Sequence, residues 1–223
     1  MHKYLDEFNI NSIQQSKYQK YYELLNEKNK VMNLTAITDQ EGVYIKHFYD
    51  SLLITKITSD FDNLVDVGSG AGFPGLVLSI YDESKHITLL EPTTKRCKFL
   101  NEVKNLLNLE NVSIINDRAE NVKNKKFNCA SARAVAQINI LLELVVPLLN
   151  VGGLFFCLKG TNYQEELTNA EGAIKELNVE IKNIYHFELP KELGKRVIIV
   201  FEKKKNTNPK YPRPYANILK KPL

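Results

Sequence analysis

Short apolar runs alternate with longer segments whose apolar residues recur at helical spacing, from residue 63 onward. The short runs are typical of buried strands, and the longer segments are typical of helices packed on a sheet. Strands are predicted in this way at residues 63–67, 86–90, 112–115, 127–131 and 153–158. Helices are predicted at about 75–80, 93–108, 138–149 and 163–177. This alternation predicts a parallel sheet with helices on both faces.

Two further strands are predicted near the C-terminus, at about 179–189 and 197–202. Residues 190–195 join them, and this link is too short for the crossover connection that parallel neighbours need. The two strands must therefore run antiparallel. The expected fold is α/β and Rossmann-like, with a seven-stranded, mostly parallel sheet and an antiparallel last strand.

The N-terminal residues show a purely helical pattern. Ser12 and Gln15 have the spacing of a capping box before a helix that runs to about Lys30. Thr38 and Glu41 have the same spacing before a second helix. The predicted division of the chain is therefore a helical cap (1–59), an α/β domain (60–204) and a basic C-terminal tail (205–223).

The first predicted strand ends in a run of glycines. Residues 63–75 read N-L-V-D-V-G-S-G-A-G-F-P-G. Gly68, Gly70 and Gly72 can adopt positive φ and carry no Cβ, so the backbone of this turn can approach a ligand closely. A strand, a glycine loop and a helix start in succession predict a binding site for a cofactor.

Two cofactor classes fit this loop. Gly70, Gly72 and Gly75 satisfy the G-x-G-x-x-G dinucleotide pattern, and Glu91 lies at the expected distance for binding ribose. Gly68, Gly70 and Gly72 also form a G-x-G-x-G loop, which resembles the first motif of S-adenosylmethionine-dependent methyltransferases. The antiparallel end of the sheet favours a methyltransferase, because a Rossmann dehydrogenase ends its sheet with a parallel unit.

Polar residues follow the predicted strands at the edge where ligands bind in open α/β sheets. Glu91 can accept hydrogen bonds from both ribose hydroxyls. Asp117, Ala119 and Glu120, after the third strand, are candidates to contact an adenine. Arg133, after the fourth, can hold a carboxylate or a phosphate in a bidentate fork. The structural alternatives are a helix N-terminal charge for the glutamates and a surface salt bridge for the arginine.

Composition narrows the class of protein. The 223 residues are 43% hydrophobic and 25% charged, which is typical of a soluble globular chain. No apolar stretch reaches the length of a membrane span, and residues 1–10 lack the apolar core of a signal peptide, so a cytoplasmic protein is expected. Cys97, Cys129 and Cys157 are far apart and the histidines are scattered, so neither disulfides nor a metal site are expected.

The net charge of +4 is distributed unevenly along the chain. Residues 203–223 hold seven Lys and Arg and no acid, which leaves −3 for residues 1–202. A basic terminus with Tyr211 and Tyr215 between its charges can neutralise phosphates and stack on bases. The commoner alternative for such a charge run is a solvated tail.

His47, Asp50 and Ser51 lie on one face of the second predicted helix. We reject a Ser-His-Asp catalytic site here, because a serine within a helix has neither a strained, exposed mount nor an oxyanion hole. These side chains are expected to fasten the helical cap to the domain, or to edge a substrate cleft.

Several motifs together resemble one bacterial family. They are N-L-T (33–35), H-F-Y-D-S-L (47–52), D-V-G-S-G-A-G-F-P-G (66–75), L-E-P-x-x-K-R (90–96), A-R-A (132–134), L-K-G (158–160) and Y-P-R (211–213), with a terminal K-K-P-L. From about residue 29 to the C-terminus, the chain is similar to the small-subunit rRNA methyltransferases called methyltransferase G or glucose-inhibited division protein B. One departure is Lys28, where the family often has Trp.

The resemblance implies a class I methyltransferase fold and transfer of a methyl group from S-adenosylmethionine to N7 of a guanine in 16S rRNA of the small ribosomal subunit. The cofactor contacts that it implies are Gly68, Phe73, Ala119, Glu120 and Arg133. Guanine N7 carries a lone pair and no proton, so no catalytic base is expected. The substrate-side candidates are His47, Asp50, Ser51, Lys159 and Arg213. A monomer is expected.

Two other classes of function stay open at this point. An NAD-dependent oxidoreductase would use the same glycine loop for a dinucleotide. A non-catalytic RNA-binding, ribosome-associated protein would use the basic tail and would need no cofactor.

Overall fold

Seven strands form one mixed sheet in the order β3-β2-β1-β4-β5-β7-β6 in the computed structural model, which describes residues 2–223. The strands are β1 (Leu64–Val67), β2 (Ile87–Leu90), β3 (Val112–Ile115), β4 (Phe127–Arg133), β5 (Leu149–Lys159), β6 (Val179–Glu188) and β7 (Lys195–Lys203). Neighbours among β1 to β5 pair in parallel, whereas β7 is antiparallel to both β5 and β6. The predicted fold class is confirmed.

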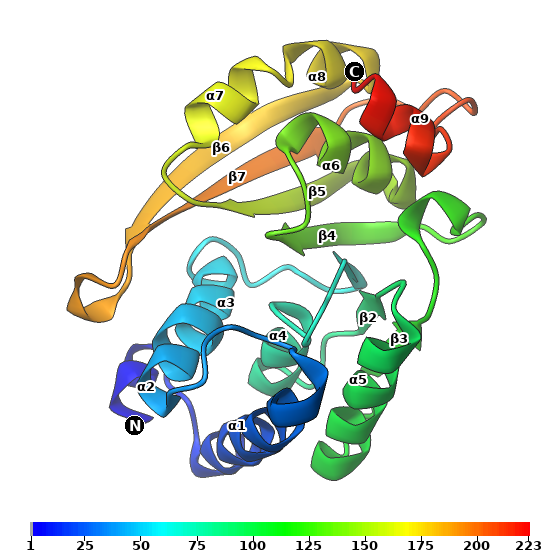
Figure 1. Cartoon of the computed structure of the whole chain (residues 1–223). Helices are drawn as coiled ribbons and strands as arrows, with labels where there is room; N and C mark the ends of the chain where they lie inside the picture. Colours follow the sequence, from blue (N-terminus) through cyan, green and yellow to red (C-terminus); the bar gives the residue numbers. More distant parts are fainter. Residues whose placement is uncertain (1) are drawn as a thin grey trace.

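Helices cover both faces of this sheet (Figure 1). Those that follow the first strand are α4 (Gly75–Tyr81), α5 (Thr94–Leu107), α6 (Ile138–Val145), α7 (Tyr163–Thr168), α8 (Glu171–Glu176) and α9 (Tyr215–Lys220), with 3₁₀ turns η5 (Ala119–Asn121), η6 (Val146–Leu148) and η7 (Pro190–Glu192). Alternate strand residues face opposite layers. Leu64 and Phe156 pack in a core with the helical cap, α4 and α5, while Val65 and Phe155 pack in a second core with α6, α8 and α9.

The largest differences between the predicted and the observed elements concern three segments. The helix predicted at 138–149 ends at Val145, and the 3₁₀ turn that follows contains Pro147, which has no N–H for a helical bond. Strand β5 begins at Leu149 instead of residue 153. Its pairing with β4 contains a bulge, and Leu149 pairs with Phe127 on the N-terminal side of that bulge. The segment 163–177 forms two short helices that break at Asn169 and Ala170.

The N-terminal cap consists of η1 (His2–Tyr4), η2 (Asp6–Phe8), α1 (Ser12–Met32), α2 (Gln40–Val43), a π-helical turn η3 (Tyr44–Tyr49), α3 (Asp50–Leu52) and η4 (Leu53–Lys56). The N-cap of each helix lies one residue from its predicted position. Asn11 Oδ1 accepts from Gln14 N at 2.9 Å and Asn11 N donates to Gln14 Oε1 at 2.8 Å, which forms a capping box, whereas Asp39 only accepts from Gly42 N at 2.6 Å. Each true cap has extended backbone angles, which place its side chain over the first helical turn.

The cap packs directly on the glycine loop between β1 and α4. The Tyr21 hydroxyl donates to Ala71 O, and the Tyr18 hydroxyl donates to Val77 O at 3.0 Å. The Tyr21 ring also stacks on Phe73, with 5.5 Å between the ring centroids. The cap and the sheet therefore share one hydrophobic core, and the cap supports the loop from above.

The C-terminal segment is packed on the domain through several buried residues, unlike the fully solvated tail that was one alternative. Lys203 is 2% exposed, and its ammonium donates to Val146 O and Leu149 O at 2.9 and 2.8 Å. Burial, together with the charge of Lys126, lowers the pKa of Lys203 to about 8. Tyr211 is also buried and donates to Glu176. Neither side chain is available to an RNA, in contrast to the sequence-based expectation.

Arg213 holds this segment to α6 through the fully buried Glu143. Its Nε and Nη2 donate to the two carboxylate oxygens at 2.8 and 2.6 Å, and its backbone N–H donates to the same group at 3.0 Å. Two parallel bonds of this kind are strong and geometrically specific.

We expect the Arg213→Ala variant to lower the free energy of unfolding by roughly 3 kcal/mol, because it leaves the Glu143 carboxylate buried without a counter-charge. Urea denaturation measures this change. The Lys210→Ala variant is the matched control, since it removes an exposed ion pair to Glu176 from the same segment and should leave stability nearly unchanged. Equal effects of the two substitutions would contradict the anchoring role of Arg213.

Candidate functional site

The glycine loop is built to bring its backbone close to another group. Gly68, Gly70 and Gly72 have φ values of +71°, +58° and +99°, in the left-handed region that favours glycine. A Cβ on Gly72 would lie 2.7 Å from the Tyr21 hydroxyl, so that glycine serves packing. A Cβ on Gly70 would meet nothing closer than Gly68 O at 3.9 Å. Gly70 therefore leaves room for a ligand.

A buried carboxylate lies beneath this loop. Asp66 Oδ2 accepts from Gly75 N at 3.0 Å, and Oδ1 accepts from the Ser131 hydroxyl at 2.9 Å. Full burial raises the pKa of Asp66 to about 6, against the lowering effect of these hydrogen bonds. Asp66 thereby ties the start of α4 to strands β1 and β4.

Glu91, at the end of β2, lies beside the loop as predicted. It is 1% exposed, and its two carboxylate oxygens accept from Gly70 N and Thr93 N, each at 2.9 Å. A carboxylate offers about four acceptor sites, so each oxygen keeps capacity for a further hydrogen bond. Glu91 thereby holds the loop at Gly70 and the start of α5 at Thr93.

A narrow crevice of about 100 Å³ opens next to Gly68 and Glu91's strand. Its lining includes the predicted residues Asp117, Ala119 and Glu120. The Asp117 carboxylate accepts from Arg118 N and from the Asn121 amide, both at 2.7 Å, and these bonds lower the pKa of Asp117. The three residues predicted to contact an adenine therefore gather at one hollow.

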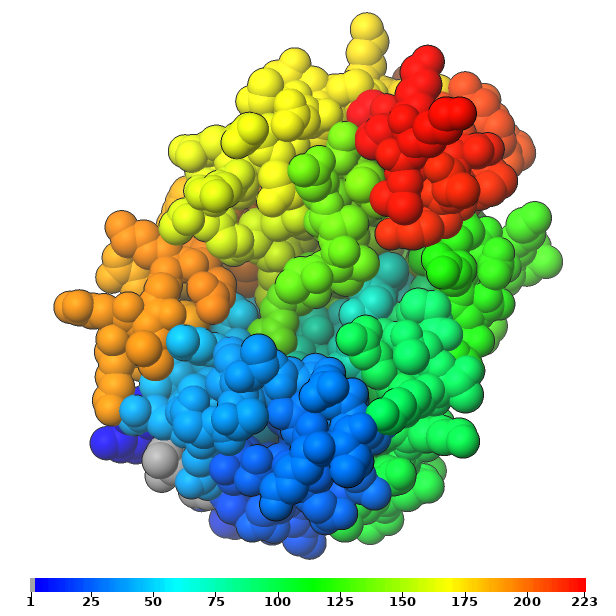
Figure 2. Space-filling view, in the orientation of Figure 1, coloured from blue at the N-terminus to red at the C-terminus, as the bar shows by residue number. Residues whose placement is uncertain are grey.

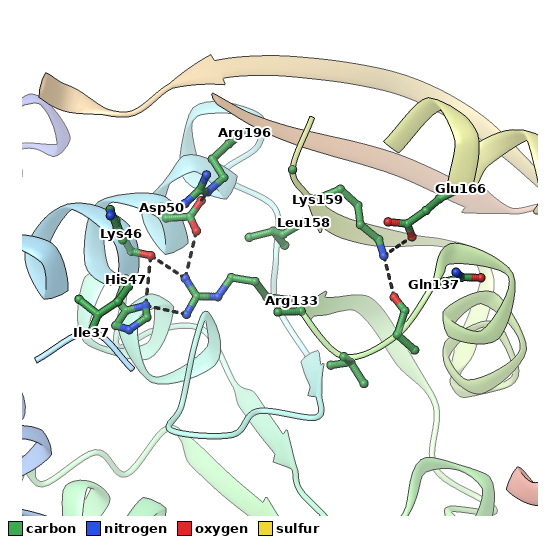
Figure 3. Close-up of a pocket in the computed structure, with 14 residues that line it drawn as sticks. Ile37, Lys46, His47, Asp50, Arg133, Gln137, Leu158, Lys159, Glu166 and Arg196 are labelled. Atoms are coloured by element: carbon green, nitrogen blue, oxygen red, sulfur yellow. Dashed lines mark hydrogen bonds and ion pairs between the residues drawn. The ribbon is translucent and has the colours of Figure 1, made fainter. Parts of the chain in front are cut away.

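Arg133 joins the end of β4 to the helical cap (Figure 3). Its guanidinium donates to Asp50 Oδ2, to Lys46 O and to His47 Nδ1, each at 3.0 Å. The Phe73 ring lies beneath both cap and arginine, 4.4 Å from the His47 ring centroid and 5.0 Å from the guanidinium carbon. The cluster expected to fasten the cap is therefore present, with Arg133 at its centre.

His47 is neutral in this cluster. Burial, and then the charge of Arg133, lowers the pKa of His47 to about 3. An unprotonated Nδ1 accepts from Arg133, which leaves Nε2 as the donor to the Thr35 hydroxyl at 2.8 Å.

A second hollow, of about 590 Å³, lies between the cap and the ends of β4, β5 and β7. Its charged lining consists of Lys46, Arg133, Lys159, Arg196, Asp50 and Glu166. Figure 3 shows Lys159 between two partners. Its ammonium donates to Ala136 O, in the 134–137 segment, at 2.7 Å and to the Glu166 carboxylate, on α7, at 2.6 Å. Four basic groups against two acidic ones give this hollow a positive character.

Val135 lies between the two hollows and lines both. A Cβ on Gly68 would lie 2.7 Å from its Cγ2 atom, so this side chain covers the start of the glycine loop. Neither Val135 nor its segment carried a motif that points to this position.

The structure does not bring all the predicted substrate-side residues together. His47, Asp50 and Lys159 line the larger hollow. Ser51 is fully buried and donates to His47 O at 2.6 Å, and Arg213 is held on α6. Within the described part of the chain, neither of these two side chains lines that hollow.

Arg196 was missed by the sequence analysis. Its Nε forms an ion pair with Asp50 Oδ1 at 3.2 Å, so Asp50 lies between two guanidinium groups. A signal was available in the antiparallel prediction. An antiparallel β7 starts beside the carboxyl end of β5, and Val197 indeed pairs with Lys159.

The described residues, 2–223, contain neither a metal-binding cluster nor a membrane-spanning helix. No group of three or more His, Cys, Asp or Glu side chains in that range is arranged to hold a metal ion. No helix among these residues is both long and apolar enough to cross a membrane.

Comparisons with known proteins place this chain in a family. Residues 14–194 match the family model described as rRNA small subunit methyltransferase G. Proteins named ribosomal RNA small subunit methyltransferase G are similar along most of the chain. The one from Staphylococcus epidermidis is 42% identical, covering 96% of this chain and 92% of its own, and the one from Carboxydothermus hydrogenoformans is 43% identical, covering 92% and 90%.

Solved structures share the fold at low sequence identity. M. jannaschii TYW2, solved in complex with AdoMet, has a TM-score of 0.58 and 17% identity, covering 75% of this chain and 79% of its own. Ribosomal protein L11 methylase from Lactobacillus delbrueckii has a TM-score of 0.55 and 18% identity, covering 72% and 79%. The class I methyltransferase fold is thereby confirmed, and neither the oxidoreductase nor the non-catalytic alternative is supported.

The lowered pKa of His47 predicts a loss of stability in acid. Between pH 6.5 and about 3 the unfolded chain binds a proton at this position and the folded chain does not, so stability falls as pH falls, by up to about 1.4 kcal/mol per pH unit. The raised pKa of Asp66 acts in the opposite direction between about 6 and 3.8, equally in wild type and variant. Urea denaturation at pH 7 and pH 5 should show a smaller acid loss for His47→Gln than for the wild type. The same loss in both proteins would refute the neutral, buried His47.

Proposed function

Because this chain belongs to the rRNA small subunit methyltransferase G family, we propose that it transfers a methyl group from S-adenosylmethionine to N7 of a guanine in 16S rRNA. It is an S-adenosylmethionine-dependent enzyme that methylates rRNA of the small ribosomal subunit. The observation that supports the proposal is the succession of glycine loop, buried Glu91 carboxylate and positive hollow along one edge of the sheet.

The residues around the loop fit the cofactor. Gly70 leaves open space where a side chain would stand, and the Glu91 carboxylate keeps acceptor capacity for two hydroxyls. We assign the adenosine to the crevice with Asp117, Ala119 and Glu120, and the amino acid part to the loop of Gly68, Gly70, Gly72 and Phe73, near Arg133. When bound, S-adenosylmethionine supplies an electrophilic methyl group on a sulfonium.

The larger hollow is suited to the acceptor nucleotide. Lys159 and Arg196 present positive charge at its wall, as a phosphate-rich substrate requires. Val135 lines both the larger hollow and the crevice. Its side chain therefore lies where the proposed sites for the acceptor nucleotide and the cofactor meet. The role of His47, Asp50 and Ser51 is to position Arg133 and the cap at the hollow's edge.

The proposed reaction needs orientation and exclusion of water more than it needs proton transfer. Guanine N7 has its lone pair in the ring plane and loses no proton when it attacks. A neutral His47 with a pKa of about 3 is a poor base, which agrees with this chemistry. Both hollows are built by one chain, and we propose that the enzyme works as a monomer in the cytoplasm.

The function is tested by transfer of tritiated methyl groups from S-adenosylmethionine to small ribosomal subunits from a strain that lacks this methyltransferase. We expect incorporation into 16S rRNA, and chain cleavage at one guanine after borohydride and aniline treatment, which acts at N7-methylguanine. Incorporation that resists this cleavage would overturn the assignment to N7. Absence of incorporation into subunits and free 16S rRNA would overturn the proposed function.

Substituting Gly70 should selectively weaken binding of the cofactor. A β-branched side chain is strained at φ +58° and would occupy the open space above the loop. Gly70→Val should therefore lower the affinity for S-adenosylhomocysteine about a hundred-fold, which corresponds to about 2.7 kcal/mol. Isothermal titration calorimetry measures this affinity. Gly152→Val is the control, because Gly152 also has positive φ (+83°) and open space but lies at the start of β5. Unchanged affinity in Gly70→Val would refute the assignment of the loop.

A further inference from the structure

The C-terminal segment passes the narrow crevice at Tyr215, on the side opposite the helical cap. Helix α9 lies against α6, and Figure 2 shows the C-terminal residues in contact with the green segments that precede them in the chain. The crevice is lined on one side by the glycine loop and the end of β2, and on another by Leu144 of α6 and Tyr215 of α9. Tyr215, the first residue of the last helix, thus lines the same hollow as Val67 at the end of the first strand.

Three contacts hold this segment in place. Tyr211 donates its hydroxyl hydrogen to Glu176 at 2.9 Å, and Arg213 forms its bidentate pair with buried Glu143. Ile218 is 0% exposed and packs in the core with α6. Since Tyr215 lies between the second and third of these contacts, the position of its backbone is determined on both sides.

The Tyr215 ring is also fixed by its neighbours at the crevice. The guanidinium carbon of Arg118 lies 5.2 Å from the ring centroid, within the range of a cation–π contact. Arg118 precedes Ala119 and Glu120, the residues assigned to the adenosine. The ring packs against the second hydrophobic core and remains partly exposed toward the crevice.

We propose that Tyr215 forms one wall of the adenosine site, so that the C-terminal segment is a structural part of the cofactor site. This inference rests on the proposed function. A purine has flat apolar faces and a polar edge. The crevice offers the apolar side chains of Leu90, Leu144 and Tyr215 next to the carboxylates of Asp117 and Glu120, which can accept from an exocyclic amine.

This assignment differs from the expectation that Tyr215 stacks on a base of the RNA. The ring lies at the crevice that holds Gly68 and Ala119, and it does not line the larger hollow. Its loss should therefore reduce affinity for the adenosine part of the cofactor itself, in the absence of any RNA.

The experiment is isothermal titration calorimetry of the full chain with S-adenosylhomocysteine and with 5′-methylthioadenosine, which has the adenosine but no amino acid part. Tyr215→Ala should weaken both ligands by the same factor, about five- to thirty-fold, which corresponds to about 1–2 kcal/mol. Tyr215→Phe should bind both like the wild type, because the ring remains. Leu219→Ala is the matched control, since Leu219 lies in the same helix and is 51% exposed.

The outcomes separate this inference from the proposed function. If the wild type binds both ligands and Tyr215→Ala binds them equally well, the wall is refuted and the methyltransferase site stands. A loss for S-adenosylhomocysteine alone would place the effect outside the adenosine and would also refute it. If the wild type binds neither ligand, both proposals fail.

A second variant guards against misfolding of Tyr215→Ala, which circular dichroism would detect. The chain contains no tryptophan, so Tyr215→Trp introduces a single indole at the crevice. Its fluorescence emission should change on addition of 5′-methylthioadenosine and saturate with the calorimetric affinity. Constant emission at saturating ligand would overturn the proposal.

Discussion

Two buried carboxylates hold the glycine loop in the shape on which the rest of the site depends. Asp66 accepts from Gly75 N beneath the loop, and Glu91 accepts from Gly70 N beside it. Tyr21 donates to Ala71 O from the cap above. Buried polar groups are stable only when their hydrogen bonds are satisfied, so each contact needs the others in place. The loop is thereby held at three points, and we expect that binding a ligand requires little further ordering.

The second element of the site is the connection between sheet and cap. Asp50 accepts from Arg133 and forms an ion pair with Arg196, and neutral His47 accepts from Arg133, so one buried acid and one imidazole orient two cations at the edge of the larger hollow. This arrangement leaves net positive charge on the wall of the larger hollow, where we propose that the rRNA binds. Methyl transfer to an atom that already has a free lone pair requires such positioning and no proton relay.

Much of this could be predicted from local patterns. The strands, the glycine loop, Glu91 and Arg133 each follow from apolar periodicity or from position at a strand end, because parallel strands bring their carboxyl ends to one edge. The cap positions of α1 and α2 were each off by one residue, since several neighbouring polar residues can cap a helix and only the backbone angles decide.

The remaining features depend on packing between distant parts of the chain. Lys203 is the last residue of β7 and the first of a basic run, so the sequence suggested an exposed side chain. The fold instead buries its ammonium, which donates to two backbone carbonyls. Tyr215 reads as part of a polar tail, and its place at the crevice comes from the pairing of Arg213 with Glu143, 70 residues earlier. Val135 has no motif at all, and only the three-dimensional path of its segment places it over Gly68.

The most direct test of this account is a crystal structure of the full chain with S-adenosylhomocysteine. We expect both ribose hydroxyls within about 3 Å of the Glu91 carboxylate, with the amino acid part across Gly68 to Gly72. An occupied site whose ribose points away from Glu91, or a ligand bound elsewhere on the protein, would contradict it.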